Sequence, residues 1–227
     1  MSDIKIIYKD KDLIAIIKPV GMPSQADPTG DADALTSTSA FLASQNEASE
    51  LFLLHRLDRG VGGVLIFARN KKAAAAVSEI FAQRLAEKEY FAAVRGECEG
   101  GVYRDLLYKD AKQGKSFVVK SMRSGVREAE LSADPISSAA LDGKDMTLMR
   151  VSLKTGRHHQ IRVQFSSRRH PLVGDKKYGD SDARTRFPAL FATSLRFSLG
   201  GRDYRFDAVP DASAYPWCHF QYFLKED

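Results

Sequence analysis

The sequence predicts an α+β fold with a mixed, mostly antiparallel sheet. Short β-prone segments outnumber the helical ones, and they do not alternate with helices as parallel βαβ units require. Of the 227 residues 44% are hydrophobic, which is enough to bury a core. No repeat, low-complexity tract or linker divides the chain. We therefore expect one domain over residues 1–227.

The first third of the chain alternates β-prone and polar segments. The pattern predicts strands at 4–8 and 13–17, a loop at 24–33, a short helix around Leu35 and Leu42, and short strands at 51–54 and 64–68. A helix follows over Lys71–Lys88, because Asn70 is a favourable N-cap and four apolar residues recur at helical spacing: Val77, Ile80, Phe81 and Leu85.

The remainder of the chain is rich in β-prone segments. These lie at 90–95, 116–120, 126–131, 147–153, 191–199 and 203–209. Residues 159–166 could form a short helix or a strand, and the alternation of Ile161, Val163 and Phe165 with polar residues favours a strand. The rest of residues 100–143 is polar and contains Gly and Ser, and its pattern favours no particular element.

A polar loop, His55-Arg56-Leu57-Asp58-Arg59-Gly60, lies between two predicted strands. Short loops that leave a sheet often carry catalytic groups on a rigid scaffold. Three potential cations surround one carboxylate, which should be ionised at neutral pH and could act as a nucleophile or a base. The alternative is a surface turn that contains a local salt bridge.

A second polar cluster runs from Thr155 to Val163 and contains Arg157, two adjacent histidines and Arg162. The histidines lack the spacing of a helical metal pair. Contact with phosphate or carboxylate groups by the two arginines is therefore the better functional interpretation, with a solvated basic face as the alternative. Tyr90 is a core residue or, if its strand faces a cleft, a platform for an unstacked base.

Charge and cysteine content limit the class of protein. Lys and Arg number 34 against 29 Asp and Glu, and a basic balance favours polyanionic partners such as RNA. Charge alone favours the alternative, a soluble protein with a slight basic excess. The two cysteines, Cys98 and Cys218, suggest neither a disulfide framework nor a zinc site. The apolar run 13–17 is too short for a signal sequence or a membrane span. We expect a cytoplasmic monomer that contacts no membrane.

Taken together and in this order, the motifs resemble the RluA-like family of pseudouridine synthases. The matching segments are His55-Arg56-Leu57-Asp58, Lys88-Glu89-Tyr90, Thr155-Gly156-Arg157 with His159-Gln160-Ile161-Arg162-Val163, and His170-Pro171-Leu172-Val173-Gly174-Asp175 leading to Tyr178-Gly179. The opening, which ends in Lys18-Pro19-Val20-Gly21-Met22-Pro23, is also similar to the family's start. The resemblance covers about residues 4–199.

The resemblance implies a central cleft flanked by helices and loops, and it implies roles for individual residues. Asp58 matches the catalytic aspartate, Tyr90 the tyrosine that stacks on the target base, and Arg162 the arginine that pairs with the aspartate. Arg56 matches an arginine that helps to fill the space of the flipped nucleotide. Further RNA contacts are expected from Arg59, Arg157, His159 and Lys176.

The implied reaction converts a specific uridine in structured ribosomal or transfer RNA to pseudouridine. The N1–C1′ bond breaks, the uracil turns, and C5 is joined to C1′, without net redox change, so no cofactor and no metal are expected. The carboxylate either adds to C1′ or removes a proton from C2′. The uridine must be flipped out of the stacked RNA. The N-terminal S4 domain that many relatives carry is not expected, because the catalytic pattern begins at residue 4.

Three positions depart from the family pattern. Its usual Thr-Ser-Gly-Leu segment is Val61-Gly62-Gly63-Val64 here, its Thr before His-Gln is His158, and a common His is Phe191. A catalytically silent RNA-binding relative is therefore the alternative function. A hydrolase of sugar glycosides is a further rival, but that class usually uses two carboxylates and the motifs supply one.

Overall fold

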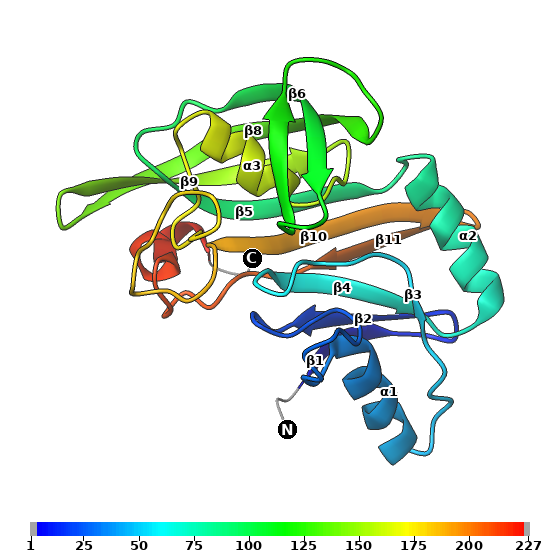
Figure 1. Ribbon diagram of the computed structural model, residues 1–227. Helices are drawn as coiled ribbons and strands as arrows, with labels where there is room; N and C mark the ends of the chain where they lie inside the picture. Colours follow the sequence, from blue (N-terminus) through cyan, green and yellow to red (C-terminus); the bar gives the residue numbers. More distant parts are fainter. Residues whose placement is uncertain (1–3, 225–227) are drawn as a thin grey trace. The chain divides into compact units, whose positions relative to one another are not determined.

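The computed structural model describes residues 4–224 (Figure 1). Contacts within the chain group it into two compact units, each built from two stretches of sequence. Unit 1 comprises the residues up to Glu87 together with Ala192–Ala208, and unit 2 comprises Lys88–Phe191 and the residues from Val209 onward. That the chain works as one catalytic domain stays a prediction.

Unit 1 is a sheet with two helices. Its strand order is β1-β2-β4-β10, with β3 paired to β4 and β11 paired to β10. The elements are β1 (Lys5–Lys9), β2 (Leu13–Lys18), α1 (Ala34–Ser44), β3 (Phe52–Leu53), β4 (Gly62–Ala68), α2 (Lys71–Ala82), β10 (Leu190–Leu199) and β11 (Arg202–Asp207). Apart from the end of α2, each of these lies within a few residues of the segment that the sequence predicts.

The core of unit 1 forms around β2 and β4. The two strands are antiparallel, with Ile14 opposite Phe67 and Ile16 opposite Leu65, and all four side chains are fully buried. Branched and aromatic side chains fit this paired, two-sided burial well. All seven residues of β4 are buried, which explains why its sequence reads as a continuous apolar run.

Helix α2 begins as predicted and ends earlier than predicted. The Asn70 side chain accepts a hydrogen bond from Ala73 N (2.8 Å), the arrangement of a typical N-cap. The expected continuation to Lys88 is wrong, because Arg84 adopts a left-handed conformation (φ 60°) and a strand starts at Glu87. Leu85, predicted to lie on the buried face, is 62% exposed.

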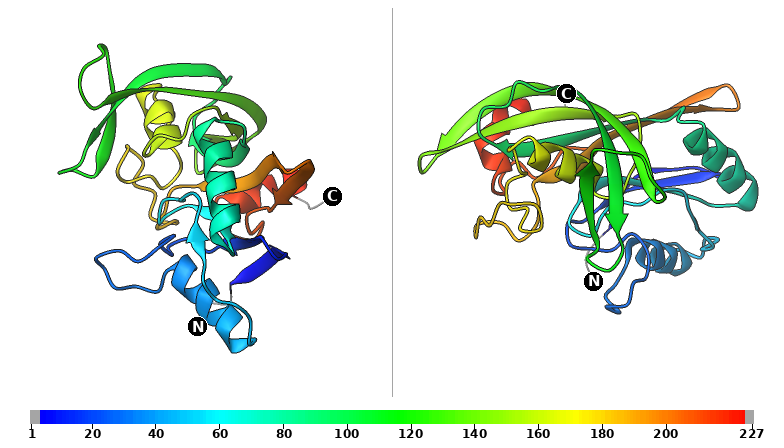
Figure 2. Two further views of the ribbon diagram at one scale, coloured as in Figure 1. Left: turned by 90° about the vertical axis from the view of Figure 1, so that its right-hand side faces the viewer. Right: turned by 45° about the horizontal axis from the view of Figure 1, so that its top comes forward.

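Within unit 2 the strands pair antiparallel, in the order β5-β9-β8-β6-β7. The long β8–β9 hairpin, yellow-green in Figure 2, extends beyond the neighbouring strands. The elements are β5 (Glu87–Arg95), β6 (Gly101–Asp110), β7 (Lys115–Val119), β8 (Val126–Leu141), β9 (Lys144–Leu153), α3 (Gln160–Ser167) and the 3-10 helix η1 (Trp217–Phe223). The predicted α+β class and antiparallel pairing are confirmed, while the central cleft stays a prediction.

The strand favoured for 159–166 is wrong, because Gln160–Ser167 forms helix α3. Every residue from Gln160 to Phe165 is buried, so the helix has no polar face to produce a period of 3.6. The polar residues Arg162 and Gln164 are buried because each has a partner in unit 2: Asp175 for the first, and Tyr103 O and Asp105 for the second. Local pattern could not reveal such partners.

Candidate active site

Asp58 lies in a short loop of unit 1 that is fixed on both sides. Before it, the Ser24 hydroxyl donates to Leu57 O (2.8 Å) and accepts from Leu57 N (3.0 Å). After it, Gly21 N donates to Arg59 O (2.8 Å), and Val61 N closes a turn onto Asp58 O (2.9 Å). Asp58 itself is half-buried. The loop therefore presents one carboxylate from a backbone with little freedom to move.

Lys18, the last residue of β2, contacts the backbone of this loop at Arg59. Its ammonium group is fully buried and donates to Pro19 O (2.9 Å), Met22 O (2.6 Å) and Arg59 O (3.4 Å). Burial lowers the pKa of Lys18 to about 7, and the neighbouring charge of Asp58 opposes this shift. A buried lysine with a strongly lowered pKa next to a carboxylate is typical of a functional site.

Arg59 is tied into the loop 24–33 of unit 1. Its guanidinium donates to Gly21 O (3.1 Å) and Thr29 Oγ1 (2.9 Å), and it pairs with Asp31 and, at 3.6 Å, with Asp27. The hydrogen bond with Asp31 raises the pKa of Arg59. This residue is thus a cross-link between two loops, and its predicted RNA contact stays a prediction. Its neighbour Arg56 is exposed.

Tyr90 lies in β5 of unit 2, opposite Val151 of β9, and it is 9% exposed. Lys88 lies two residues earlier on the same strand, so the two side chains point to the same face of the sheet. Burial lowers the pKa of Lys88. The strand therefore carries a buried aromatic ring and a partly desolvated amine side by side.

Arg162 of α3 makes a two-pronged ion pair with Asp175. Nε lies 2.7 Å from Oδ2 and Nη2 lies 2.8 Å from Oδ1, and the Asp175 carboxylate is 1% exposed. Such fork-like pairs fix the plane of the guanidinium as well as its position. The ring centre of Tyr178 lies 5.0 Å from the guanidinium carbon. The structure therefore shows an orienting partner that the sequence motifs do not reveal.

His159 stands directly before α3 in a left-handed conformation (φ 55°). Its Nδ1 lies 2.9 Å from the Tyr178 hydroxyl, which accepts from Ser116 N (2.7 Å), and its ring stacks on His158 at 3.7 Å. Burial, together with the charge of Arg162, lowers the pKa of His159 to about 2. The ring is thus neutral near pH 7, so it can take part in hydrogen bonds but carries no charge.

The Thr155-Gly156-Arg157 segment is a loop closed by Gln160. The Gln160 side chain accepts from Thr155 Oγ1 (2.8 Å) and Arg157 N (3.0 Å). Arg157 Nε donates to Glu128 O (2.8 Å). The remaining predicted RNA-binding residue, Lys176, is exposed on the segment that follows Asp175. Its role, like that of Arg157, stays a prediction.

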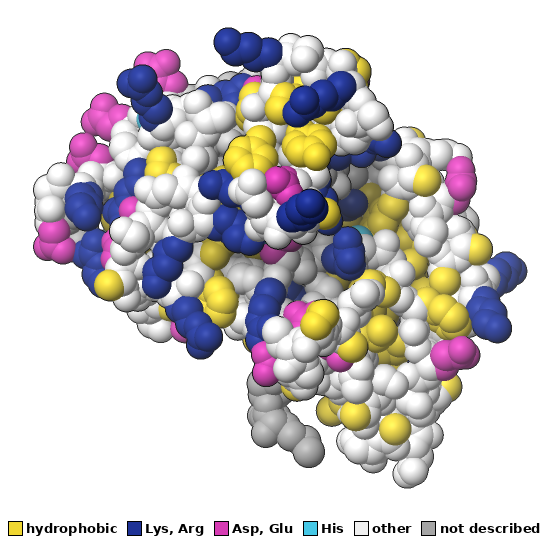
Figure 3. Space-filling model, in the orientation of Figure 1, with side chains coloured by type: hydrophobic (Ala, Val, Ile, Leu, Met, Phe, Trp, Pro, Cys, Tyr) yellow, Lys and Arg dark blue, Asp and Glu magenta, His cyan; other side chains and the backbone are white. Residues whose placement is uncertain are grey.

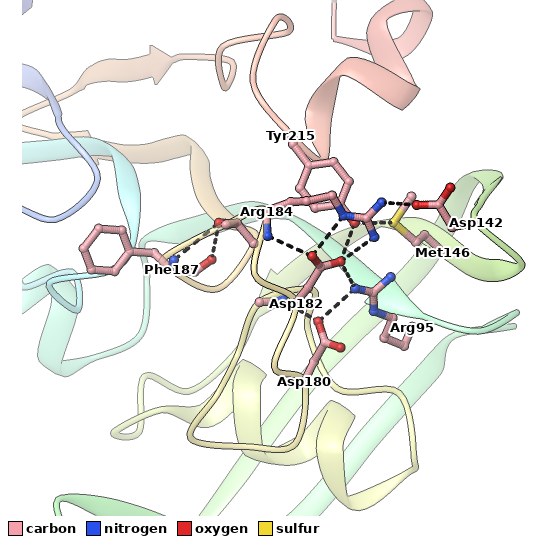
Figure 4. Close-up of polar contacts among 10 residues, drawn as sticks. Arg95, Asp142, Met146, Asp180, Asp182, Arg184, Phe187 and Tyr215 are labelled. Atoms are coloured by element: carbon pink, nitrogen blue, oxygen red, sulfur yellow. Dashed lines mark hydrogen bonds and ion pairs between the residues drawn. The ribbon is translucent and has the colours of Figure 1, made fainter.

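A charged cluster fixes the loop that runs from Asp175 to β10 (Figure 4). At its centre Asp182, whose side chain is 5% exposed, accepts from Arg95 (2.5 Å), Arg184 (2.7 Å) and the Tyr215 hydroxyl (2.8 Å). Arg95 also pairs with Asp180 (3.0 Å). Hydrogen bonding from Arg184 holds the pKa of Asp182 well below its usual range. The cluster joins this loop to β5 and to the segment around Tyr215.

One residue that keeps the family pattern and one that departs from it can be explained structurally. Gly63, which matches the family's Gly, has φ 116°, and a Cβ placed there would lie 2.2 Å from Ala192 O, so the close approach of β4 to β10 requires glycine. His158 Nδ1 lies 2.9 Å from Ser116 Oγ, so His158 takes part in the packing of α3 against β7. Phe191 is buried (6% exposed), and nothing in the structure explains why it replaces histidine.

The described part of the chain contains neither a cluster that could bind a metal ion nor a membrane-spanning helix. Among residues 4–224, no three His, Cys, Asp or Glu side chains gather in a way that could hold a metal ion. Within the same residues, no helix is both long and apolar enough to span a membrane.

Two residues of the site, Lys18 and Asp175, are not among those that the sequence predicts. The signal for Lys18 was a single lysine that ends the apolar strand Leu13–Ile17, directly before a proline. A charged residue that continues a fully buried run must be solvated by backbone or by a counterion. Asp175 ends one of the matching motifs, but the motif gave it no role, because its role depends on Arg162, thirteen residues earlier.

Two solved structures share this fold. Human RNA Pseudouridylate Synthase Domain Containing 1 superposes with a TM-score of 0.76 at 22% identity, over 92% of this chain and 84% of that chain. Human RNA Pseudouridylate Synthase Domain Containing 4 also gives 0.76, at 24% identity, over 97% and 92%. The fold is that of a pseudouridine synthase.

Sequence comparison gives the family. Residues 12–167 match the model of the RNA pseudouridylate synthase family. tRNA pseudouridine synthase C of Haemophilus ducreyi is 35% identical over 78% of this chain and 75% of its own length, and that of Vibrio cholerae is 32% identical over 89% and 85%. The chain belongs to the RNA pseudouridylate synthase family, and it is accordingly an RNA-modifying isomerase.

Proposed function

We propose that this enzyme converts one specific uridine of a structured transfer or ribosomal RNA to pseudouridine, with Asp58 as the reacting carboxylate. The observation that carries the proposal is the fixed loop around Asp58. A fully buried ammonium group, Lys18, donates to the carbonyl of Arg59, the residue after Asp58, and to those of Pro19 and Met22 in the segment that follows β2. A carboxylate held in place before the substrate arrives loses little entropy on reaction.

The reaction needs no group beyond the uridine and the carboxylate. Asp58 would either add to C1′ as the N1–C1′ bond breaks, or remove the C2′ proton to release the base. The uracil then turns, C5 bonds to C1′, and the proton of C5 is lost while N1 gains one. The sum is an isomerisation, so atoms and electrons balance without an oxidant or a reductant.

The target uridine must leave the RNA stack to reach Asp58, at a cost of about a few kcal/mol. We assign to Tyr90 the stacking contact with the flipped base and to Arg162, held in plane by Asp175, the clamp on the reacting carboxylate. Arg56 would fill the vacated space. Arg59, Arg157, His159 and Lys176 remain proposed RNA contacts, with His159 acting as a neutral hydrogen-bonding group.

The names of the relatives bear on the RNA substrate. The synthases of Haemophilus ducreyi and Vibrio cholerae are named for tRNA, the relative from Escherichia coli for the ribosomal large subunit (30% identity), and that from Vibrio vulnificus for dual specificity (31%). We therefore propose both tRNA and large-subunit rRNA as substrate classes, to be tested side by side.

The first prediction concerns Asp58→Asn. Transcripts labelled with tritium at C5 of uridine release the label only when C5 forms its bond to C1′. We expect the wild-type protein to release tritium and form pseudouridine. Asp58→Asn should lose this activity by several orders of magnitude while its thermal unfolding and RNA affinity stay close to wild type, because the change removes a charge and no volume.

Turnover by a well-folded Asp58→Asn protein would contradict the assignment of the carboxylate. Binding of RNA by the wild type without any product would instead favour the catalytically silent alternative. Release of free uracil would favour glycosidic hydrolysis.

A further inference from the structure

The β6–β7 hairpin and the turn into β8 carry an uncompensated positive charge. Five cations lie between residues 109 and 123, and no carboxylate within residues 4–224 lies at ion-pair distance from any of them: Lys109, Lys112, Lys115, Lys120 and Arg123. The single acid of this segment, Asp110, is used by the turn, where it accepts from the backbone N–H groups of Lys112 (2.9 Å) and Gln113 (3.1 Å).

Some neighbouring cations of unit 2 are paired with acids. Arg104 and Lys154 both pair with Glu130, at 3.0 and 3.4 Å. Arg168 pairs with Asp105 at 2.8 Å. Others on the same sheet, such as Arg127 of β8 and Arg150 of β9, have no ion-pair partner within residues 4–224, so what distinguishes the hairpin is the number of its unpaired cations and what they surround.

The same hairpin exposes two aromatic rings side by side. Tyr108 of β6 and Phe117 of β7 are direct cross-strand partners, and both are partly exposed. Each ring already has a cation beside it: Arg123 lies 5.2 Å from the Tyr108 ring centre and Lys115 lies 5.6 Å from that of Phe117. In Figure 3, hydrophobic side chains surrounded by Lys and Arg lie near the top of the view, over the region labelled β6 in Figure 1.

We propose that this surface, the β6–β7 platform, binds RNA in addition to the Asp58 loop. It consists of Tyr108 and Phe117 with the five cations named above. The aromatic pair would stack an unpaired nucleotide of the substrate, and the cations would contact the phosphates on either side. The inference rests on the proposed function in that the substrate is RNA, but it does not depend on which residue reacts.

The combination of rings and unpaired cations favours RNA over other occupants. Every base offers a flat face for stacking regardless of its identity, and cation-lined aromatic platforms are the usual way to hold single strands. A purely solvated basic face gives no reason for two adjacent rings at its centre. An A-form duplex keeps its bases stacked inside, so the platform should prefer loops and single-stranded ends.

Loss of a ring tests the stacking contact. The affinity of the full-length protein for a short single-stranded oligouridylate and for an RNA duplex is measured for Tyr108→Leu and Phe117→Leu. We expect about tenfold weaker binding of the single strand for each variant, with little change for the duplex. Phe41→Leu, a change at a 43% exposed phenylalanine of α1 in unit 1, is the matched control and should change neither.

Loss of charge tests the phosphate contacts without touching the packing of the hairpin. For Lys112→Gln with Lys120→Gln, the slope of log affinity against log salt for the single strand should fall by about 1.4, or about 0.7 for each phosphate that the variant no longer neutralises. The exposed pair Lys71→Gln with Lys72→Gln on α2 is the control and should leave the slope unchanged.

Unchanged affinity in the ring variants together with an unchanged salt slope would overturn the platform, and the face would then belong to another kind of partner. Equal losses for single strand and duplex would overturn the stacking contact. Tritium release is measured on the same proteins. If the wild type formed no pseudouridine while the ring variants still lost single-strand affinity, the proposed function would fail and the platform would stand.

Discussion

The buried ammonium group of Lys18 has a free-energy cost that depends on pH. Its pKa is about 7 in the folded protein, against about 10.4 in an unfolded chain. Between these values the unfolded chain binds a proton that the folded protein does not bind. Stability therefore rises with pH across this window, by at most about 1.4 kcal/mol per pH unit, and the contribution is flat below pH 7.

Replacement of Lys18 should reveal how its titration changes the free energy of unfolding with pH. Lys18→Met removes the titration and leaves Pro19 O and Met22 O without their donor. We expect the wild type to be the more stable protein, by a margin that widens as the pH rises from 7 towards 10. Chemical denaturation of both proteins over this range provides the measurement, and a margin that is constant or narrows with pH would show that the amine is protonated throughout.

The pair formed by Arg162 and Asp175 permits a test that separates stability from catalysis. Arg162→Met leaves a carboxylate that is 1% exposed without its cation, which should lower the free energy of unfolding by about 3 kcal/mol. Adding Asp175→Leu removes the orphaned charge and should restore most of that loss. Single-turnover rate at saturating RNA should stay low in both variants, if Arg162 acts on the reacting carboxylate.

A double variant that is stable and also turns over at the wild-type rate would contradict this assignment. It would limit the ion pair to holding α3 against the loop that follows it. A normal single-turnover rate with a shallower salt slope would instead identify Arg162 as a phosphate contact.

Among the elements, β4 illustrates why one glycine matters more than others. Gly63 stands opposite Lys18 in the β2–β4 register and faces the backbone of Ala192. Gly63 therefore combines a positive φ with direct backbone contact between β4 and β10. Gly30 has a comparable φ of 72°, but no other atom lies within 4 Å of the point where a Cβ would stand.

These two glycines form a matched pair for measurement. Gly63→Ala should lower the free energy of unfolding by more than about 3 kcal/mol, because the strands must separate to admit the methyl group. Gly30→Ala should cost about 1 kcal/mol, the backbone strain alone. Thermal or chemical unfolding of both variants checks the difference, and equal losses would mean that β4 and β10 can part easily.

The elements also show how far sequence can predict the fold. Strands with apolar, branched residues, such as β2 and β4, are predicted close to their observed bounds because their pattern reflects their own burial. β6 is not predicted, because one of its faces carries partly exposed Tyr108 and exposed Arg104, and its pattern lacks a clear apolar alternation. The prediction for α3 is wrong because its polar residues are buried by partners far along the chain.

The same distinction holds for the candidate site. Asp58, Tyr90 and Arg162 could be named because they fall within short motifs whose order is informative. Lys18 and the Arg95–Asp182 cluster could not be assigned, because their roles come from contacts between segments that lie as much as 87 residues apart in sequence. Sequence motifs thus identify the candidate reacting residues, whereas the residues that fix their positions are identified only by contacts in the folded structure.

At the scale of the whole molecule, each unit is assembled from two separated stretches of chain. Unit 1 receives β10 and β11 from Ala192–Ala208, and unit 2 receives η1 from the residues after Val209. Contacts between distant parts of a sequence slow folding, because the loop must close before the contact stabilises it.

Because both units take residues from after Phe191, we expect a chain that ends at Phe191 to be incomplete in both units and poorly folded. The soluble yield of this shortened chain and its resistance to protease, compared with those of the full-length chain, provide the measurement. A stable, protease-resistant fragment would contradict the prediction.

This discontinuity has a consequence for synthesis on the ribosome. β4, whose seven residues are all buried in the finished protein, is made early and pairs with β2, but its partner β10 is translated more than a hundred residues later. Throughout that interval the nascent chain presents an apolar strand with an open edge, the feature that most readily recruits a second chain. The speed of translation through residues 69–189 thus sets how long each molecule is at risk of aggregation before its sheet can close.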